Sequence, residues 1–236
     1  MTVSRIAHLA VALDTADWGE FRSWCERFGP RAGVLKVGLE AYLRWGPRAA
    51  EVALESGAKL FLDLKLHDIP NTVEGATRSA ADLGASYLTV HAGGGSVMME
   101  SAATAAEGRL SVLAVTLLTH LDRAELARLD LAGEPQERVT SWAALARSAG
   151  CAGVVCSALE VGALRARFAR PFTLVTPGIR FEAGFESDTA DDDQRRVATP
   201  EAALADGADL LVVGRPLTRA DEPERVLSRL ADAATR

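Results

Sequence analysis

Eight short apolar segments, spread along the whole chain, constrain the fold of this sequence more than any other feature. Most are near-continuous runs of β-branched residues, leucine and alanine, each followed by a polar or glycine-containing turn. Such runs are typical of parallel strands that are buried on both faces. We expect strands at 6–13, 33–37, 60–65, 87–91, 111–117, 153–156, 172–176 and 210–213.

Alanine-rich helical stretches alternate with these strands, among them 48–56, 72–83, 96–106, 139–149 and 200–205. Several end in a glycine, as a helix C-terminus prefers: Gly57, Gly84, Gly150 and Gly207. The interval between the fifth and sixth strands is longer and leaves room for a short extra helix near 123–129. Eight such units predict a (β/α)8 barrel (TIM barrel) rather than a doubly wound sheet, and residues 1–236 are expected to form a single domain.

The composition narrows the functional classes. With 26 Lys and Arg against 32 Asp and Glu, the net charge is −6, which does not suit a nucleic-acid binder. No apolar stretch is long enough to span a membrane. The first residues lack a signal-peptide pattern, and the three cysteines have no metal-ligand spacing. We expect a protein of the reducing cytoplasm.

The sequence FLDLKLHDIPNT at 61–72 places two charged residues inside an apolar strand. Because side chains alternate along a strand, Asp63 and Lys65 share one face and the neighbouring leucines share the other. Charges in a barrel mouth need neighbours or a ligand to neutralise them. Lys36 on the preceding strand is the expected third member, and Asp68, just past the strand end, a possible fourth. We expect an alternating Lys–Asp–Lys–Asp array with every member ionised.

Purely structural interpretations of these charges stay open. The array could be a structural ion-pair network at the barrel rim, and Asp68 could simply cap the next helix. The histidines His8 and His91 are expected to line or cap strands, and no metal site is expected. The sequence HAGGGS at 91–96 could bind a second phosphate, although a strand-to-helix turn is favoured.

The sequences TPGIR (176–180) and VVGRPLT (212–218) follow the seventh and eighth strands. Glycine-rich turns at these positions of a barrel commonly bind phosphate through backbone N–H groups and an arginine. Gly214 and Arg215 suit a phosphate dianion, so we expect a phosphorylated ligand. The polar segment 180–196 is favoured as a closing lid, although the acidic run 191–193 argues for plain surface.

The chain resembles the orotidine 5′-phosphate decarboxylase family, and the long motif around Asp63 is its most specific part. The matching segments run the length of the chain: ALD (12–14), KVGLE (36–40), FLDLKLHDIPNTV (61–73), VHAGGG (90–95), VTLLT (115–119), VTPGIR (175–180), DQRR (193–196), ATPEAAL (198–204) and VVGRPLT (212–218). The resemblance implies cofactor-independent decarboxylation of orotidine 5′-phosphate to UMP and CO₂, the last step of de novo pyrimidine biosynthesis. It implies no metal and no organic cofactor.

The resemblance also implies roles for single residues. Lys65 would protonate the ring carbon that loses CO₂, and Asp63 would sit against the substrate carboxylate. Lys36 and Asp68 would complete the catalytic array. The resemblance also implies these substrate contacts: Asp14 and Lys36 with the ribose, Thr119 with the pyrimidine, and Arg180, Gln194, Gly214 and Arg215 with the phosphate or in the lid.

The resemblance further implies a homodimer with shared active sites, to which Asp68 and Thr72 come from the partner subunit. One departure concerns the base: His120 stands where the family usually has serine. Two other functions remain. One is a sister enzyme that acts on a sugar phosphate with Mg²⁺, and the other is a non-enzymatic barrel that senses a nucleotide.

Overall fold

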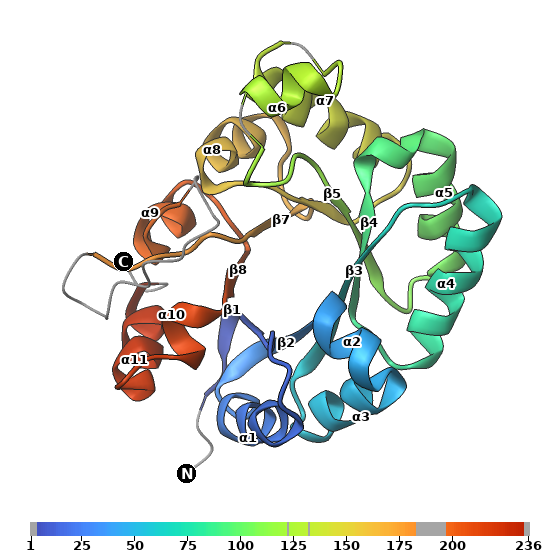
Figure 1. The fold of residues 1–236 in the computed structure, drawn as a ribbon. Coiled ribbons are helices and arrows are strands. Elements are labelled where there is room, and N and C mark those ends of the chain that lie inside the picture. Colours follow the sequence, from blue (N-terminus) through green and yellow to red (C-terminus); the bar gives the residue numbers. More distant parts are fainter. Residues whose placement is uncertain (1–3, 122, 132, 183–196, 234–236) are drawn as a thin grey trace.

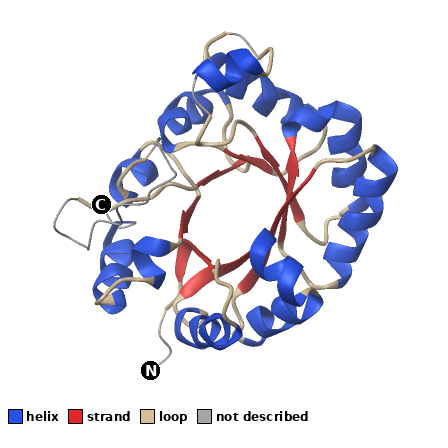
Figure 2. Cartoon of the chain, viewed as in Figure 1, coloured by secondary structure: helices blue, strands red, loops and turns tan. Residues whose placement is uncertain are grey.

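The computed structural model describes residues 4–121, 123–131, 133–182 and 197–233. Within them, eight parallel strands close into a barrel in sequence order, and the eighth strand pairs with the first. The strands form an inner ring and the helices form a ring around it (Figures 1 and 2). The expected (β/α)8 barrel is confirmed.

The strands lie where the apolar runs predict them, with ends that differ by no more than two residues. Their bounds are β1 Ile6–Ala12, β2 Ala32–Gly38, β3 Lys59–Leu66, β4 Tyr87–His91, β5 Ser111–Val115, β6 Gly153–Val155, β7 Thr173–Thr176 and β8 Leu210–Val213. The largest difference is at β5, which ends at Val115 and leaves Thr116 and Leu117 in the loop that follows.

The helices cover the outside of the barrel. They are α1 Trp18–Phe28, α2 Leu39–Trp45, α3 Pro47–Glu55, α4 Pro70–Asp82, α5 Gly95–Ala105, α6 Arg123–Arg128, α7 Pro135–Ser148, α8 Ala158–Arg167, α9 Pro200–Ala205, α10 Arg215–Thr218 and α11 Pro223–Ala233, with a 3₁₀ turn η1 at Ala92–Gly94. The short extra helix expected near 123–129 is α6. The four glycines expected at helix ends all have positive φ: Gly57, Gly84, Gly150 and Gly207.

Two apolar layers arise from the alternation of side chains along the strands. The inner layer, inside the barrel, is the cluster of Ala10, Val34, Phe61, Leu113, Val175 and Leu210. The residues next to them, such as Leu35 and Leu60, belong to the larger cluster between the strands and the helices. The side chains two residues after Val34 and Phe61 therefore also point inward, near the C-terminal mouth of the barrel.

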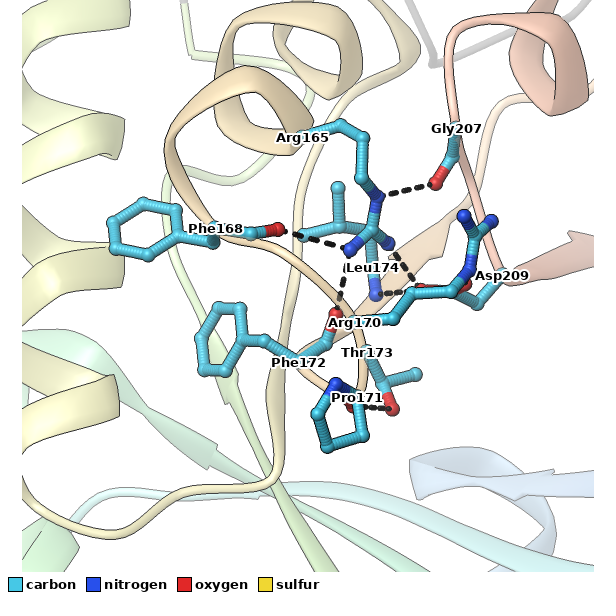
Figure 3. A network of polar contacts seen from close by, with 9 residues as sticks. All are labelled: Arg165, Phe168, Arg170, Pro171, Phe172, Thr173, Leu174, Gly207 and Asp209. Carbon is cyan, nitrogen blue, oxygen red and sulfur yellow. Dashed lines mark hydrogen bonds and ion pairs between the residues drawn. The ribbon is translucent and has the colours of Figure 1, made fainter.

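At the opposite, N-terminal end of β7 and β8, a charged cluster ties three segments together (Figure 3). Asp209, just before β8, forms ion pairs with Arg165 and Arg170 and accepts the backbone N–H of Leu174. The Arg165 guanidinium also donates to three backbone carbonyls, those of Phe168, Phe172 and Gly207, each at 3.0 Å. We call this set the Arg165–Asp209 cluster.

The three cysteines, Cys25, Cys151 and Cys156, are free and buried. Burial raises the pKa of Cys25 and of Cys151 to about 12, which leaves both thiols uncharged at neutral pH. Across the described residues, no helix has both the length and the apolar character that a membrane span requires.

Candidate active site

A cavity of about 820 Å³ opens at the C-terminal ends of the strands, where barrels of this kind carry their chemistry. Eight of the residues singled out from the sequence line it: Asp14, Lys36, Asp63, Lys65, Thr119, Arg180, Gly214 and Arg215. Phe61 and Val175 of the inner apolar layer also line the cavity. The cavity therefore has a charged wall above an apolar base.

Strand alternation brings the first two charges of this wall together. Lys36 lies two residues after Val34 on β2, and Asp63 lies two residues after Phe61 on β3. Because alternate side chains share a face, both charged side chains face the barrel axis. Lys36 is buried, with only 7% of its side chain exposed, and Asp63 has 14% exposed. Their charged atoms, Lys36 Nζ and Asp63 Oδ2, lie 3.3 Å apart.

The array continues on both sides of this pair. Lys65 Nζ donates to Asp63 Oδ1 at 2.8 Å, and Lys36 Nζ lies 3.4 Å from both carboxylate oxygens of Asp14 at the end of β1. The four charges alternate in sign along a line over the ends of β1, β2 and β3, in the order Asp14, Lys36, Asp63, Lys65. Lys36, Asp63 and Lys65 of the expected array lie in contact, and Asp14 rather than Asp68 is the second carboxylate beside them within this chain.

The surroundings keep the central pair ionised. Burial alone would raise the pKa of Asp63, but the charges of Lys36 and Lys65, with hydrogen bonds from Lys65 and Thr89, lower it to about 2. Burial would likewise lower the pKa of Lys36, but the charges of Asp63 and Asp14 outweigh it and raise that pKa. A fixed carboxylate thus stands between two ammonium groups at the cavity wall.

Glycine at position 38 makes room for the Asp14–Lys36 contact. A Cβ atom on Gly38 would lie 2.5 Å from Asp14 Oδ1, closer than real Cβ contacts allow, and 3.1 Å from Lys36 Nζ, a tight contact. The φ of Gly38 is −89°, so the backbone itself would accept another residue. Glycine therefore leaves the Asp14 and Lys36 side-chain ends in place, whereas a larger residue would make them shift. The sequence analysis missed this role, although KVGLE contains the residue.

The opposite wall carries the cationic groups expected for phosphate. Arg180 follows β7, and Arg215 begins the short helix α10 directly after Gly214. Arg180 Nη1 donates to the carbonyl of Ile179 at 2.8 Å, and its backbone N–H donates to Ala198 at 2.9 Å, which ties the two flanks of the 180–196 segment together. A third arginine, Arg219, also lines the cavity one helical turn after Arg215. The sequence analysis missed it, although the four-residue spacing was a usable signal.

The remaining predicted positions are not among the residues that line the cavity in the described part of the chain. Asp68 and Thr72 are exposed and do not line the cavity of their own chain, and Asp68 Oδ1 accepts the backbone N–H of Ile69 at 2.7 Å. Gln194, with most of the expected lid, lies outside the described residues. His120, at the usual serine position, is exposed and does not line the cavity, whereas Thr119 does.

The histidines take the structural positions expected of them. His8 Nε2 lies 2.8 Å from the carbonyl oxygen of Leu230, and the rings of His67 and His91 stack at 5.3 Å. Burial, then the charges of His67 and Lys65, lowers the pKa of His91. Within the described ranges, no three His, Cys, Asp or Glu side chains are placed to hold a metal ion. The glycines of HAGGGS form η1 and the start of α5, which is a strand-to-helix turn.

Comparisons with known proteins cover nearly the whole barrel. The family model described as "Orotidine 5'-phosphate decarboxylase / HUMPS family" matches residues 7–230. A curated relative from Thermobifida fusca, named orotidine 5'-phosphate decarboxylase, is 48% identical over 95% of this chain and 94% of its own length. One of the same name from Anaeromyxobacter sp. (strain K) is 47% identical, over 94% and 96% respectively.

A solved structure gives the same result in three dimensions. The crystal structure of orotidine 5'-phosphate decarboxylase from Lactobacillus acidophilus superposes on this chain with a TM-score of 0.82 at 33% identity. The match covers 97% of this chain and 99% of that one. The similarity therefore extends over all eight strands rather than over the motif around Asp63 alone.

Proposed function

Because the chain belongs to the orotidine 5'-phosphate decarboxylase / HUMPS family, we propose that it converts orotidine 5′-phosphate to UMP and CO₂, the last step of de novo pyrimidine synthesis. One observation carries the proposal: the Lys65 ammonium, 2.8 Å from a buried carboxylate and facing the cavity, is placed to act on a substrate. A decarboxylation that uses the Lys65 ammonium and the Asp63 carboxylate requires no metal and no organic cofactor.

The reaction breaks the bond between a ring carbon and its carboxylate, and the electron pair stays on the ring carbon as CO₂ leaves. A fixed ammonium stabilises negative charge where it forms, and it is already oriented before the reaction begins. Lys65 then transfers a proton to that carbon and becomes a neutral amine, which regains a proton from solvent. Asp63 holds the Lys65 ammonium in place and faces the substrate carboxylate.

The remaining residues bind the parts of the substrate that do not react. Lys36 and Asp14 are proposed to contact the ribose hydroxyls, and Thr119 the pyrimidine. Arg180, Gly214 and Arg215 are proposed to hold the phosphate, with Gln194 from the expected lid. Binding energy at the phosphate, far from the reacting carbon, can then be used to assemble the closed site. The free, buried cysteines suit the cytoplasm in which we expect the enzyme to act.

We also propose a homodimer in which Asp68 and Thr72 complete the partner's site. Both residues are exposed at the rim of their own barrel. Large apolar side chains are exposed on the segments that follow the neighbouring strands β2, β3 and β4: Leu43 by 82%, Ile69 by 67% and Val97 by 65%. Large apolar side chains exposed on three successive segments favour an interface between subunits.

Wild-type protein in excess EDTA tests the reaction itself. We expect orotidine 5′-phosphate to lose its ultraviolet absorbance and UMP to accumulate at a rate that chelation does not change. Binding of UMP without turnover would favour a nucleotide sensor. Turnover of a sugar phosphate only, and only with added Mg²⁺, would favour the sister enzyme.

Subunit mixing tests the shared site. Asp68→Ala and Lys65→Ala proteins, each inactive alone, should regain activity when mixed under conditions that exchange subunits, because the mixed dimer contains one undamaged site. The control is each variant mixed with itself. An absence of recovery, with subunit exchange shown independently, would rule out a contribution of Asp68 across the interface.

A further inference from the structure

The backbone of β3 is distorted at Lys65. Leu62 pairs with Leu88 and Leu66 pairs with Val90, so residues 63–66 of β3 run beside only residues 89–90 of β4. Lys65 itself has a φ of +49°, in the left-handed region that residues with a side chain rarely adopt. Such a bulge re-aims a side chain, and a surrounding contact must hold it in place.

A threonine of β4 supplies that contact. The Lys65 backbone N–H, which a regular ladder would direct to a backbone carbonyl, donates instead to Thr89 Oγ1 at 2.9 Å. The same hydroxyl donates to Asp63 Oδ1 at 3.0 Å, the oxygen that also accepts from Lys65 Nζ at 2.8 Å. One hydroxyl thus joins the backbone of Lys65 to the carboxylate that orients its ammonium.

Thr89 is shielded from solvent, so water does not compete for its hydrogen bonds. Thr89 follows Tyr87 on the face of β4 that points into the barrel, and it is completely buried. A hydroxyl has one donor and can accept at the same time, so both of its hydrogen bonds are made within this unit. The closed arrangement of Thr89, Asp63 and Lys65 fixes the ammonium from its backbone and from its tip.

We propose that Thr89 is a positioning residue of the decarboxylase, whose hydroxyl holds the bulge at Lys65 and the Asp63 carboxylate in one geometry. It does not touch the substrate in this account and acts through Lys65 and Asp63. The inference rests on the proposed function, because it assigns Lys65 the proton transfer. Loss of the hydroxyl should therefore slow the chemical step more than it weakens substrate binding.

Valine, serine and a second threonine provide a matched set of variants. Thr89→Val keeps the shape and removes the hydroxyl, whereas Thr89→Ser keeps the hydroxyl and removes the methyl group. Thr116→Val is the control: Thr116 is equally buried, and its hydroxyl donates to the carbonyl of Val155 at 2.9 Å rather than to a charged group. Thr89→Ala is a second hydroxyl-free variant in case the valine fails to fold.

We expect kcat for Thr89→Val to fall about tenfold to hundredfold, the size of effect that misplacing a catalytic group by about 1 Å produces. KM and the Kd for UMP should change less than about threefold, and Thr89→Ser should restore most of the lost kcat. Thermal unfolding of each variant shows whether the protein is folded. Thr116→Val should keep the wild-type kcat.

Each other outcome counts against the proposal. Wild-type kcat in folded Thr89→Val or Thr89→Ala would show that the hydroxyl does not position Lys65. An equal loss in Thr89→Ser, or in Thr116→Val, would show that packing in the barrel matters rather than this hydroxyl. The wild-type rate is measured first: its absence would overturn the proposed decarboxylation, whereas its presence beside an unaffected Thr89→Val overturns only the role of Thr89.

Discussion

Two aspartates at opposite ends of the barrel each accept two cationic side chains, and they serve different purposes. Asp63, at the C-terminal mouth, contacts Lys36 and Lys65. Asp209, at the N-terminal end, contacts Arg165 and Arg170. In each cluster the aspartate and one cation, Lys36 or Arg165, lie largely out of water, where removing one partner is costly.

The cations differ in where their donors point. Arg165 directs three of its N–H groups to backbone carbonyls around the ends of β7 and β8, so its rigid fork joins separate segments of the chain (Figure 3). Lys65 presents a compact ammonium at the wall of a large cavity. The Arg165–Asp209 cluster is suited to stability, and the contacts of Asp63 with Lys36 and Lys65 are suited to chemistry. This matches the division of roles between the two faces of such barrels.

Among the changes that leave Lys65 in place, removing the cation between the two mouth carboxylates should give the largest effect. Lys36→Met leaves Asp14 and Asp63 facing each other without the charge that separates them, and the pKa of Asp63 should rise. We expect kcat/KM to fall by at least about a hundredfold, as when one preorganised electrostatic contact is lost. Initial rates of substrate depletion measure this, and a loss below about threefold would contradict the role given to the array.

Breaking the opposite cluster should cost stability and leave chemistry intact. Arg165→Met leaves the Asp209 carboxylate and three carbonyls with a lost partner, so the free energy of unfolding should fall by about 3 kcal/mol. Urea unfolding measures it, with Arg22→Met as control, because Arg22 makes only an exposed pair with Glu26. A drop in kcat of the folded variant would contradict the assignment of this cluster to stability alone.

A single methyl group should disturb substrate binding at the mouth. Gly38→Ala places a Cβ 2.5 Å from Asp14 Oδ1, so the Asp14 carboxylate must shift from its position beside Lys36. If Asp14 contacts the ribose, KM should rise about tenfold, while kcat changes less. Gly162→Ala on α8 is the control, since its Cβ would meet nothing closer than 4.0 Å. An unchanged KM would argue against Asp14 as a binding residue.

The smallest expected effect is a pH dependence of stability. The pKa of Asp63 is lowered from 3.8 to about 2 in the folded chain, so its contribution is complete above the unfolded value and is lost as pH falls toward 2. Between pH 5 and pH 3 we expect the stability advantage of wild type over Asp63→Asn to shrink by about 1 kcal/mol. Urea unfolding measures this difference in stability, and the same difference at both pH values would contradict the lowered pKa.

The mouth of the barrel could be predicted because its signals are local. Charges at every second position inside an apolar run identify the inward face of β3, and the parallel topology then places Lys36 beside Asp63. The glycines after the helices follow from the same kind of reasoning, since a helix end in the left-handed region favours glycine.

The other features depend on contacts between distant residues that look ordinary in the sequence. Arg165 and Asp209 are 44 residues apart, and each resembles a common surface charge. Thr89 is a typical strand residue, and its role appears only once the bulge at Lys65 brings a backbone N–H to its hydroxyl. The contact of Asp14 with Lys36 joins β1 to β2, and the Asp68 carboxylate accepts the backbone N–H of Ile69 instead of contacting Lys65 in its own chain, neither of which the motif around Asp63 indicates.

In the proposed mechanism, the ammonium of Lys65, and not the barrel as a whole, carries the reaction. The most direct measurement is the rate of orotidine 5′-phosphate depletion in excess EDTA, per folded molecule, for wild type, Lys65→Met and Arg165→Met. We expect Arg165→Met to stay within about threefold of wild type and Lys65→Met to fall by about a thousandfold or more. A folded Lys65→Met protein that still decarboxylates at a rate close to wild type would contradict the account.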